Sequence, residues 1–305
     1  MGNSNIIGTR KKIIIPKKTR DNLIAFSFIG PSFIGYFILT LLPIGASTVL
    51  TFFNWSGGAT ARFAGLYNYR QLIRNDTFRI SVFNTFYLWI GVMPLTAILA
   101  FGLALLLNRG FKARNIVRSA CFFPHVASVI TIAGVFNMLF NPLMGPVNNL
   151  LSSLGVENLP GWASDVRWAM PMVIICTIWK NVGYYMVIYL AALQTVSKEL
   201  YEAAKIDGAS SWQSLKRITV PMLTPTTFFV MMMLTINCFQ SFDLIYVLTK
   251  GGPGRATTIL VLHIYNSFYN YQYGYAITVA VMLLLIILVI TVIQFQMERK
   301  WVSYM

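Results

Sequence analysis

The sequence predicts an all-α membrane protein with six transmembrane helices and a helical cytoplasmic loop. Composition is the first reason: 56% of the 305 residues are hydrophobic and only 11% are charged, whereas soluble domains carry about 25% charged residues. The second reason is that six stretches each reach the roughly 20 apolar residues of a membrane helix. The third is the position of the 24 lysines and arginines, which lie mostly between these stretches.

The predicted spans follow one another from residue 22 onward. They are Asn22–Phe53, Phe83–Asn108, Asn115–Phe140, Trp168–Leu193, Ile218–Leu248 and Tyr275–Met297. The first is longer than a straight span requires, and the prolines and glycines within it predict a bend. We therefore expect a basic cytoplasmic tail, residues 1–21, followed by one membrane domain, residues 22–305.

Lysine and arginine are distributed unevenly between the two sides of the predicted membrane. Sixteen lie in the N-terminal tail, the connections after the second and fourth spans, and the C-terminus. Seven lie in the other connections, and Lys180 lies inside the fourth span. Because positively charged loops remain in the cytoplasm, both termini and the loop after the fourth span are predicted to be cytoplasmic. The net charge of +15 is therefore topological and predicts no nucleic-acid partner.

The three connections on the opposite side are too long to be simple turns. They comprise residues 54–82, 141–167 and 249–274, and they are rich in tryptophan and tyrosine. Such residues suit the membrane interface, where lipid surrounds the chain, and they equally suit contact with an external partner.

The cytoplasmic loop at about residues 197–217 has the signals of two short helices. Ser197 is a typical N-cap, and Glu199 complements the dipole of the first helix. Gly208 offers a left-handed stop. Ser210 and Gln213 then have the spacing of a capping box, which predicts a second helix.

One face of the first loop helix is small and apolar. It carries Leu200, Ala203 and Ala204, and small residues permit close approach of another surface. Glu202 and Asp207 stand beside it as charged groups. So short a helix is marginally stable alone in water, which favours a packed protein partner. A solvated helix at the membrane surface is the alternative.

The chain lacks the motifs of several enzyme classes. It contains no G-x-x-x-x-G-K-[ST], no H-E-x-x-H and no G-x-S-x-G, so we expect no catalytic residue and no ATP site on this chain. The histidines and cysteines have no metal-binding spacing, so no metal site is predicted, and packing or a local hydrogen bond is expected for each of them. They are His125, His263, Cys121, Cys176 and Cys238.

Polar and aromatic residues interrupt two of the apolar spans and are candidates for lining a solute cavity. The fourth span contains Trp179, Lys180, Asn181, Tyr184 and Tyr185, and the fifth contains Asn237, Gln240, Ser241 and Asp243. Aromatic faces, amides and hydroxyls together suit sugars, whose rings have apolar faces and hydroxyl rims. Hydrogen bonding between helices is the alternative role, with about 0.6–2 kcal/mol for each bond.

Lys180 lies near the centre of its span. A lysine there costs about 2.5–3.5 kcal/mol on insertion, so its ammonium group must face a cavity or a partner. Asp243 is one candidate partner, and an anionic solute is another. The sequence leaves both open.

The segment EAAKIDGASSWQSLKRITVP resembles the EAA loop of the permeases of ABC importers. The pattern is filled by Glu202, Ala203, Ala204, Gly208, Ile218 and Pro221. Further segments resemble the carbohydrate-uptake branch, in the class of the maltose and glycerol-phosphate permeases: FAGLYNYRQL, FNT, FFPHVAS, FDLIYVLTKGGPG and YGYAITVAV. His125 departs from this pattern, in which a small or apolar residue is expected. The resemblance covers nearly all of the chain from residue 22.

The resemblance implies a function and a set of partners. The loop would be a coupling helix that docks on a separate cytoplasmic ATPase subunit, with Glu202, Ala203, Ala204, Asp207 and Gly208 at the contact. ATP and Mg would bind to a dimer of that ATPase, so this chain would need no cofactor. A second, homologous permease subunit would complete a heterodimer in the bacterial cytoplasmic membrane. An extracytoplasmic solute-binding protein would deliver a sugar or oligosaccharide to the cavity between the spans.

Two other classes fit less well. A secondary solute transporter would use intramembrane acids or an inverted repeat, but Asp243 is the only acid that the sequence places well inside a span, and no repeat is visible. A membrane-embedded acyltransferase would need a histidine and an aspartate at short spacing, and neither histidine has one.

Overall fold

The computed structural model describes residues 17–58, 60–110 and 112–302, and it confirms the predicted all-α membrane fold. Within these residues the exception is a short antiparallel pair, β1 (Phe53–Asn54) and β2 (Arg62–Phe63). The chain divides into two compact units, Met1–Leu50 and Thr51–Met305. Most of the predicted basic tail lies outside the described residues, and the predicted boundary at residue 22 stays a prediction.

The first unit is a single helical segment. It consists of α1 (Lys17–Tyr36), a π-helical turn (Phe37–Leu41) and α2 (Leu42–Leu50). Residues Ala25–Leu50 are long and apolar enough to cross a membrane. Its large apolar side chains are exposed, Phe28 by 80% and Leu39 by 78%, so this segment requires an apolar environment such as lipid. The bend predicted for this span stays a prediction.

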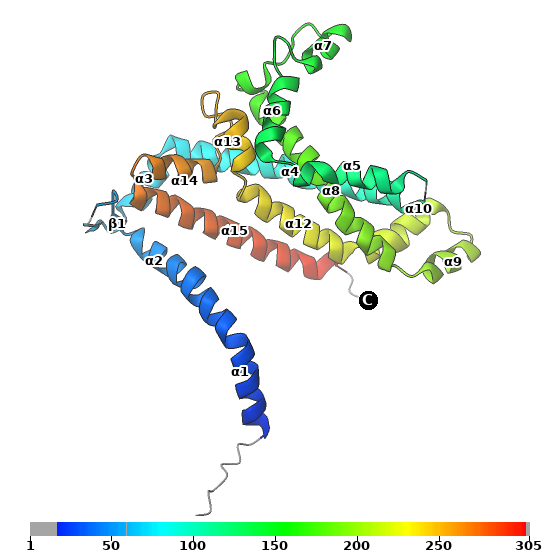
Figure 1. The fold of residues 1–305 in the computed structure, drawn as a ribbon, viewed down its shortest axis with the longest axis horizontal. Helices are drawn as coiled ribbons and strands as arrows, with labels where there is room; N and C mark the ends of the chain where they lie inside the picture. Colours follow the sequence, from blue (N-terminus) through cyan, green and yellow to red (C-terminus); the bar gives the residue numbers. More distant parts are fainter. Residues whose placement is uncertain (1–16, 59, 111, 303–305) are drawn as a thin grey trace, which may run out of the picture. The chain divides into compact units, whose positions relative to one another are not determined.

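Four helices form the body of the second unit (Figure 1). They are α4 (Asp76–Asn108), α8 (Ala169–Thr195), α12 (Thr224–Phe239) and α15 (Tyr273–Trp301). Helix α4 packs along α8, and α12 contacts α4, α8 and α15. Three of these helices, α4, α8 and α15, are each long and apolar enough to span a membrane. They correspond to the second, fourth and sixth predicted spans.

The third predicted span is broken, so its prediction as one continuous helix was wrong. It consists of α5 (Arg114–Val126) and α6 (Val129–Leu139), which meet at an angle of 101°. Ala127 and Ser128 between them have extended backbone angles, and Ser128 takes the N-cap position of α6. Hydropathy measures the apolar content of a window and does not register this break.

The fifth predicted span is also interrupted. The helical segment at Ser211–Met222, which includes α10 (Ser211–Ser214), a π-helical turn (Leu215–Thr219) and α11 (Val220–Met222), meets α12 at 62°. Helix α12 ends at Phe239, and Asp243 begins a separate helix, α13 (Asp243–Thr249). The placement of Asp243 inside a span was therefore wrong. The described residues contain six spans when each bent pair counts as one.

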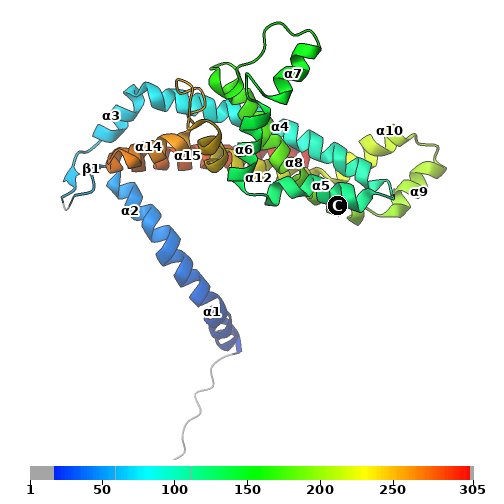
Figure 2. The same cartoon turned by 45° about the horizontal axis from the view of Figure 1, so that its top comes forward.

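The remaining helices gather at the ends of the long helices. Helices α3 (Tyr67–Arg74) and α14 (Leu260–Tyr269) lie at one end, and α9 (Lys198–Ile206) lies with α10 at the other (Figures 1 and 2). Helix α7 (Pro146–Ser153) follows α6 and is joined to α8 through a 3-10 turn at Trp162–Ser164. The predicted long connections on one side thus contain helices of their own.

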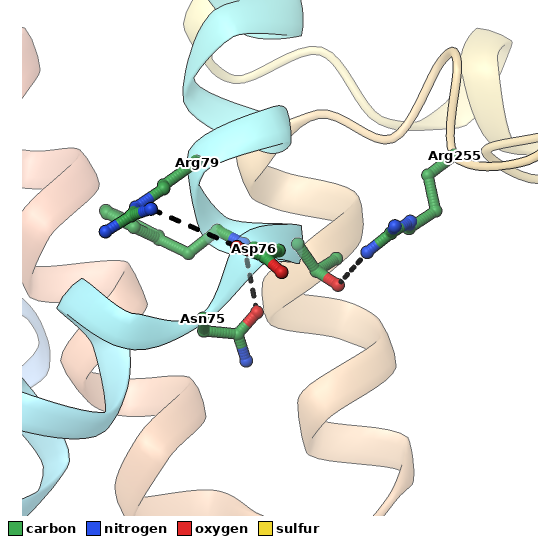
Figure 3. Close-up of polar contacts among 6 residues, drawn as sticks. Asn75, Asp76, Arg79 and Arg255 are labelled. Atoms are coloured by element: carbon green, nitrogen blue, oxygen red, sulfur yellow. Dashed lines mark hydrogen bonds and ion pairs between the residues drawn. The ribbon is translucent and has the colours of Figure 1, made fainter.

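Polar contacts fix the start of α4 (Figure 3). Asn75 caps the helix by accepting a bond from the backbone N–H of Phe78 at 3.2 Å, and Asp76 pairs with Arg79 at 4.0 Å. Arg255 donates to the hydroxyl of Thr77 at 3.0 Å. Deeper along α4, the amide of Asn84 donates to the Arg255 carbonyl at 3.0 Å. These bonds fasten the loop after α13, which contains the GGPG sequence, to the first turns of α4.

A buried hydroxyl joins three of the long helices. The indole of Trp89 on α4 and the amide of Gln294 on α15 both donate to the Thr235 hydroxyl, each at 2.9 Å. Thr235 on α12 in turn donates to the carbonyl of Met231 at 2.8 Å. The hydroxyl therefore has its one donor and its two acceptor positions occupied.

Cys176, Cys238 and His263 are buried, as expected for packing residues, and Cys121 is half-buried. The three cysteines are free, and the described residues contain no cluster that could hold a metal ion. His263 on α14 is buried, with its Nε2 3.1 Å from the Tyr275 hydroxyl. Burial lowers the pKa of His263 to about 4, so its ring is neutral at pH 7.

Helices α5 and α8 approach each other closely at Gly183. A Cβ at this position would overlap the backbone carbonyl of Cys121 on α5. The neighbour is backbone rather than a flexible side chain, so it has little freedom to move away. The contact therefore requires a glycine.

We predict that Gly183→Ala destabilises the protein. The methyl group would force α5 away from α8, and overpacking of this kind costs about 1–3 kcal/mol. Gly102→Ala is the matched control, because Gly102 also lies in a long helix but has open space at its Cβ position. The measurement is the melting temperature of each purified variant in detergent. Equal melting temperatures for the two variants would contradict the close packing.

Candidate functional site

The loop between α8 and α12 has the local structure that its sequence predicts. Ser197 accepts a bond from the N–H of Glu199 at 3.2 Å and caps α9. At the other end, Gly208 has a φ of +75°. The N–H of Ala209 donates to the Ala204 carbonyl at 2.8 Å, and that of Gly208 donates to the Lys205 carbonyl at 3.2 Å. This pair of bonds is a complete Schellman ending.

The second loop helix, α10, begins with the predicted capping box. The Gln213 side chain accepts from the Ser210 N–H at 2.7 Å, and the Gln213 N–H donates to the Ser210 hydroxyl at 3.3 Å. The hydroxyls of Tyr201 and Thr219 lie 2.9 Å apart and tie α9 to the π-helical turn that follows α10. The two helices are thus held in a defined arrangement without any partner.

Helix α9 has two distinct faces. Glu202, Ala203 and Ile206 are exposed, and Ile206 is exposed by 87%. Tyr201, which is half-buried, and Lys205, which is exposed, line a cavity of about 700 Å³. Its lining also includes Leu105, Arg109, Leu193, Trp212 and Leu215.

The candidate cavity residues of the fourth span lie on the middle of α8. Trp179 is 44% exposed and packs on Phe136 of α6, with ring centroids 5.3 Å apart. Asn181 donates to the carbonyl of Thr177 on its own helix at 2.9 Å. Tyr184 is half-buried and Tyr185 is buried, so of these three aromatic residues Trp179 is the most exposed.

The candidates of the predicted fifth span come from two elements and the turn between them. Asn237 lies at the end of α12, Gln240 and Ser241 lie in the turn, and Asp243 begins α13. Asn237 and Gln240 are exposed. The amide of Asn237 donates to the Tyr185 hydroxyl at 2.8 Å. The structure therefore joins one candidate of the fifth predicted span to one candidate of the fourth.

Lys180 and Asp243 do not form the ion pair that the sequence left open. The ammonium group of Lys180 donates instead to the backbone carbonyl of His125 at 3.5 Å. Asp243 is exposed at the first position of α13.

His125, for which the sequence predicted packing or a local hydrogen bond, packs against α8. Its ring stacks on Tyr184, with centroids 4.4 Å apart and planes at 15°, and its Nδ1 is buried without a hydrogen-bond partner. The available signal was its departure from an apolar pattern in FFPHVAS. That departure did not indicate which residue the ring would stack on.

Comparison with known proteins identifies the family. The model of the binding-protein-dependent transport system inner membrane component matches residues 93–303. A lactose transport system permease protein of Rhizobium radiobacter is 35% identical over 248 residues, covering 80% of this chain and 83% of that protein. A sulfoquinovosyl glycerol transport system permease protein of Agrobacterium fabrum is 30% identical over 264 residues, covering 84% of this chain and 85% of that protein.

Solved structures share the fold. A bacterial ABC transporter involved in the import of the acidic polysaccharide alginate matches with a TM-score of 0.81 at 24% identity, covering 94% of this chain and 99% of that chain. The alginate transporter in complex with a pentasaccharide-bound periplasmic protein matches with a TM-score of 0.80, covering 93% and 96%. The chain therefore belongs to the family of binding-protein-dependent transport system inner membrane components, as a membrane-spanning permease subunit.

Proposed function

We propose that this chain is a permease subunit of an ABC importer for a sugar or oligosaccharide. The main structural support is helix α9, which has an exposed face and lies at one end of the long helices. Its two ends are defined by the Ser197 cap and the Schellman bonds. Relatives named for lactose, trehalose and maltose, sulfoquinovosyl glycerol, and starch degradation products support the solute class. The secondary-transporter alternative is weakened, because Asp243 lies beyond the end of α12 in an exposed position.

In this proposal the energy comes from other chains. ATP and Mg bind to a dimer of cytoplasmic ATPase subunits, and this chain carries no cofactor. A homologous permease subunit completes the membrane heterodimer, and an extracytoplasmic binding protein docks on the opposite side. The coupling surface consists of Glu202, Ala203, Ala204, Asp207 and Gly208, of which Glu202, Ala203, Asp207 and Gly208 are exposed and Ala204 is half-buried.

We also propose that both termini are cytoplasmic, from the charge bias described above. Single cysteines at Ser4 and Ser303, which lie outside the described residues, should resist a membrane-impermeant thiol reagent applied to intact cells from outside. A cysteine at Ser153 of α7 should react and serves as the positive control. The three natural cysteines are replaced in this background. Labelling of the terminal cysteines from outside would overturn the orientation.

The coupling role predicts that Glu202→Lys and Gly208→Asp abolish transport while the chain remains inserted. The first reverses a charge at the proposed contact, and the second places a side chain at a left-handed position. Glu157→Lys and Gly155→Asp are matched controls, because Gly155 also has a positive φ, of +84°, and open space around it. The measurement is co-purification of the ATPase subunit, which the controls should retain. Retention in all four variants would refute the docking role.

The solute proposal predicts that the cognate binding protein takes carbohydrates in a ligand screen. Asn181→Ala, Tyr184→Ala and Gln240→Ala should each lower uptake about 5–10-fold, as expected for the loss of about 1–1.4 kcal/mol. Ile175→Ala, at an exposed apolar position on the same helix, should transport normally. Lys180→Met should lower uptake of an acidic sugar more than that of a neutral sugar. A binding protein that takes only amino acids or peptides would overturn the carbohydrate assignment.

A further inference from the structure

The break between α5 and α6 leaves backbone carbonyls without helical partners. The last carbonyls of any helix lack partners within that helix, and in a membrane interior there is no water to satisfy them. At the end of α5 the N–H of Ala127 donates to the Phe123 carbonyl at 3.1 Å. For the carbonyl of His125, the donor in the structure is the ammonium group of Lys180.

Lys180 is a positive charge that needs a partner, just as the end of α5 needs a hydrogen-bond donor. It is a half-buried cation in the middle of a helix that spans the membrane, where a charge needs a partner inside the protein. The described residues offer it no carboxylate within ion-pair distance. The negative end of the α5 dipole is the partner that the structure supplies, and cations are stabilised at helix C-termini.

The neighbours of Lys180 hold both arms of the broken helix. Gly183 and Tyr184 lie three and four residues after Lys180, on the same face of α8. Gly183 admits the α5 backbone, and Tyr184 stacks on His125 near the end of α5. Trp179, one residue before Lys180, packs on Phe136 of α6. The segment Trp179–Tyr185 therefore contacts α5, including its C-terminal end, and also contacts α6.

We propose that Lys180 is a positioning residue that caps α5 and sets the angle between α5 and α6. Its ammonium group donates to the His125 carbonyl, which the break leaves without a helical partner. The negative end of the α5 dipole in turn stabilises the positive charge of Lys180. Trp179 and Tyr184 each pack on one arm, so the bend fixes the placement of two candidate solute contacts. This role bears on the proposed cavity, but it does not depend on which solute is carried.

The test measures the angle without any solute. Spin labels at Ser119→Cys on α5 and Met138→Cys on α6, both exposed, report the distance between the two arms by double electron–electron resonance. The full chain is purified with its partner subunits in lipid nanodiscs, after replacement of the three natural cysteines. Labelled protein with Lys180 should give one narrow distance distribution.

Substitutions at Lys180 then separate charge from packing. Lys180→Arg keeps the cation and should retain the narrow distribution, whereas Lys180→Gln and Lys180→Met should broaden and shift it. Lys180→Gln is the milder change and serves if Lys180→Met does not fold. Ile175→Ala, one turn or more away on α8, is the control and should leave the distribution unchanged.

Two results would overturn the proposal: an unchanged distribution in Lys180→Gln, or the same broadening in Lys180→Arg as in Lys180→Met. The result is distinguishable from failure of the proposed function. If the solute is not a carbohydrate, Lys180→Gln should still broaden the distance distribution. If the angle between α5 and α6 does not depend on the charge of Lys180, Lys180→Gln should leave the distribution unchanged even in a carbohydrate permease.

Discussion

A membrane interior offers no hydrogen-bonding solvent, so every backbone group that a helix end frees must be satisfied by the protein. This constraint is mild for α4, α8 and α15, which run without interruption. It is severe for α5 and α12, which end within the stretches that hydropathy marks as single spans. Three polar residues of the apolar regions lie near these two ends: Lys180 at the end of α5, and Asn237 and Gln240 at the end of α12. Of these three, Lys180 donates to a carbonyl at the end of the broken helix.

The limits of prediction follow from the same constraint. Continuous spans were predictable because a run of apolar residues is both the signal and the cause of a membrane helix. The caps at Ser197, Gly208 and Ser210 were predictable because each acts within a few residues of itself. The break after Val126 was not predictable in this way, since apolar content says nothing of backbone continuity. The partner of Lys180 was missed for a related reason: it is a backbone carbonyl, and a search for charged side chains could only suggest Asp243.

The arrangement of elements relates the two proposed activities of the chain. Helix α8 carries the candidate cavity residues at its middle and ends at Thr195, and Val196 and Ser197 alone separate it from α9. Val196 is buried, and Ser197 caps α9, so the junction is short and held at both sides. In the proposed function, a displacement of α9 by an ATPase subunit would therefore reach α8 directly. Helices α3 and α14 lie at the other end of the long helices, where the proposed binding protein would dock (Figure 1).

The hydroxyl of Thr235 has a consequence for biosynthesis. Its two donors come from residues 89 and 294, which are separated by most of the length of the chain. Trp89 and Thr235 are both translated before Gln294. Before Gln294 is present, the Thr235 hydroxyl can accept the bond from Trp89 but not the bond that fixes α15. The three helices share this junction only once residue 294 has been synthesised, so a chain truncated before that residue would hold Thr235 in the membrane without its bond from α15.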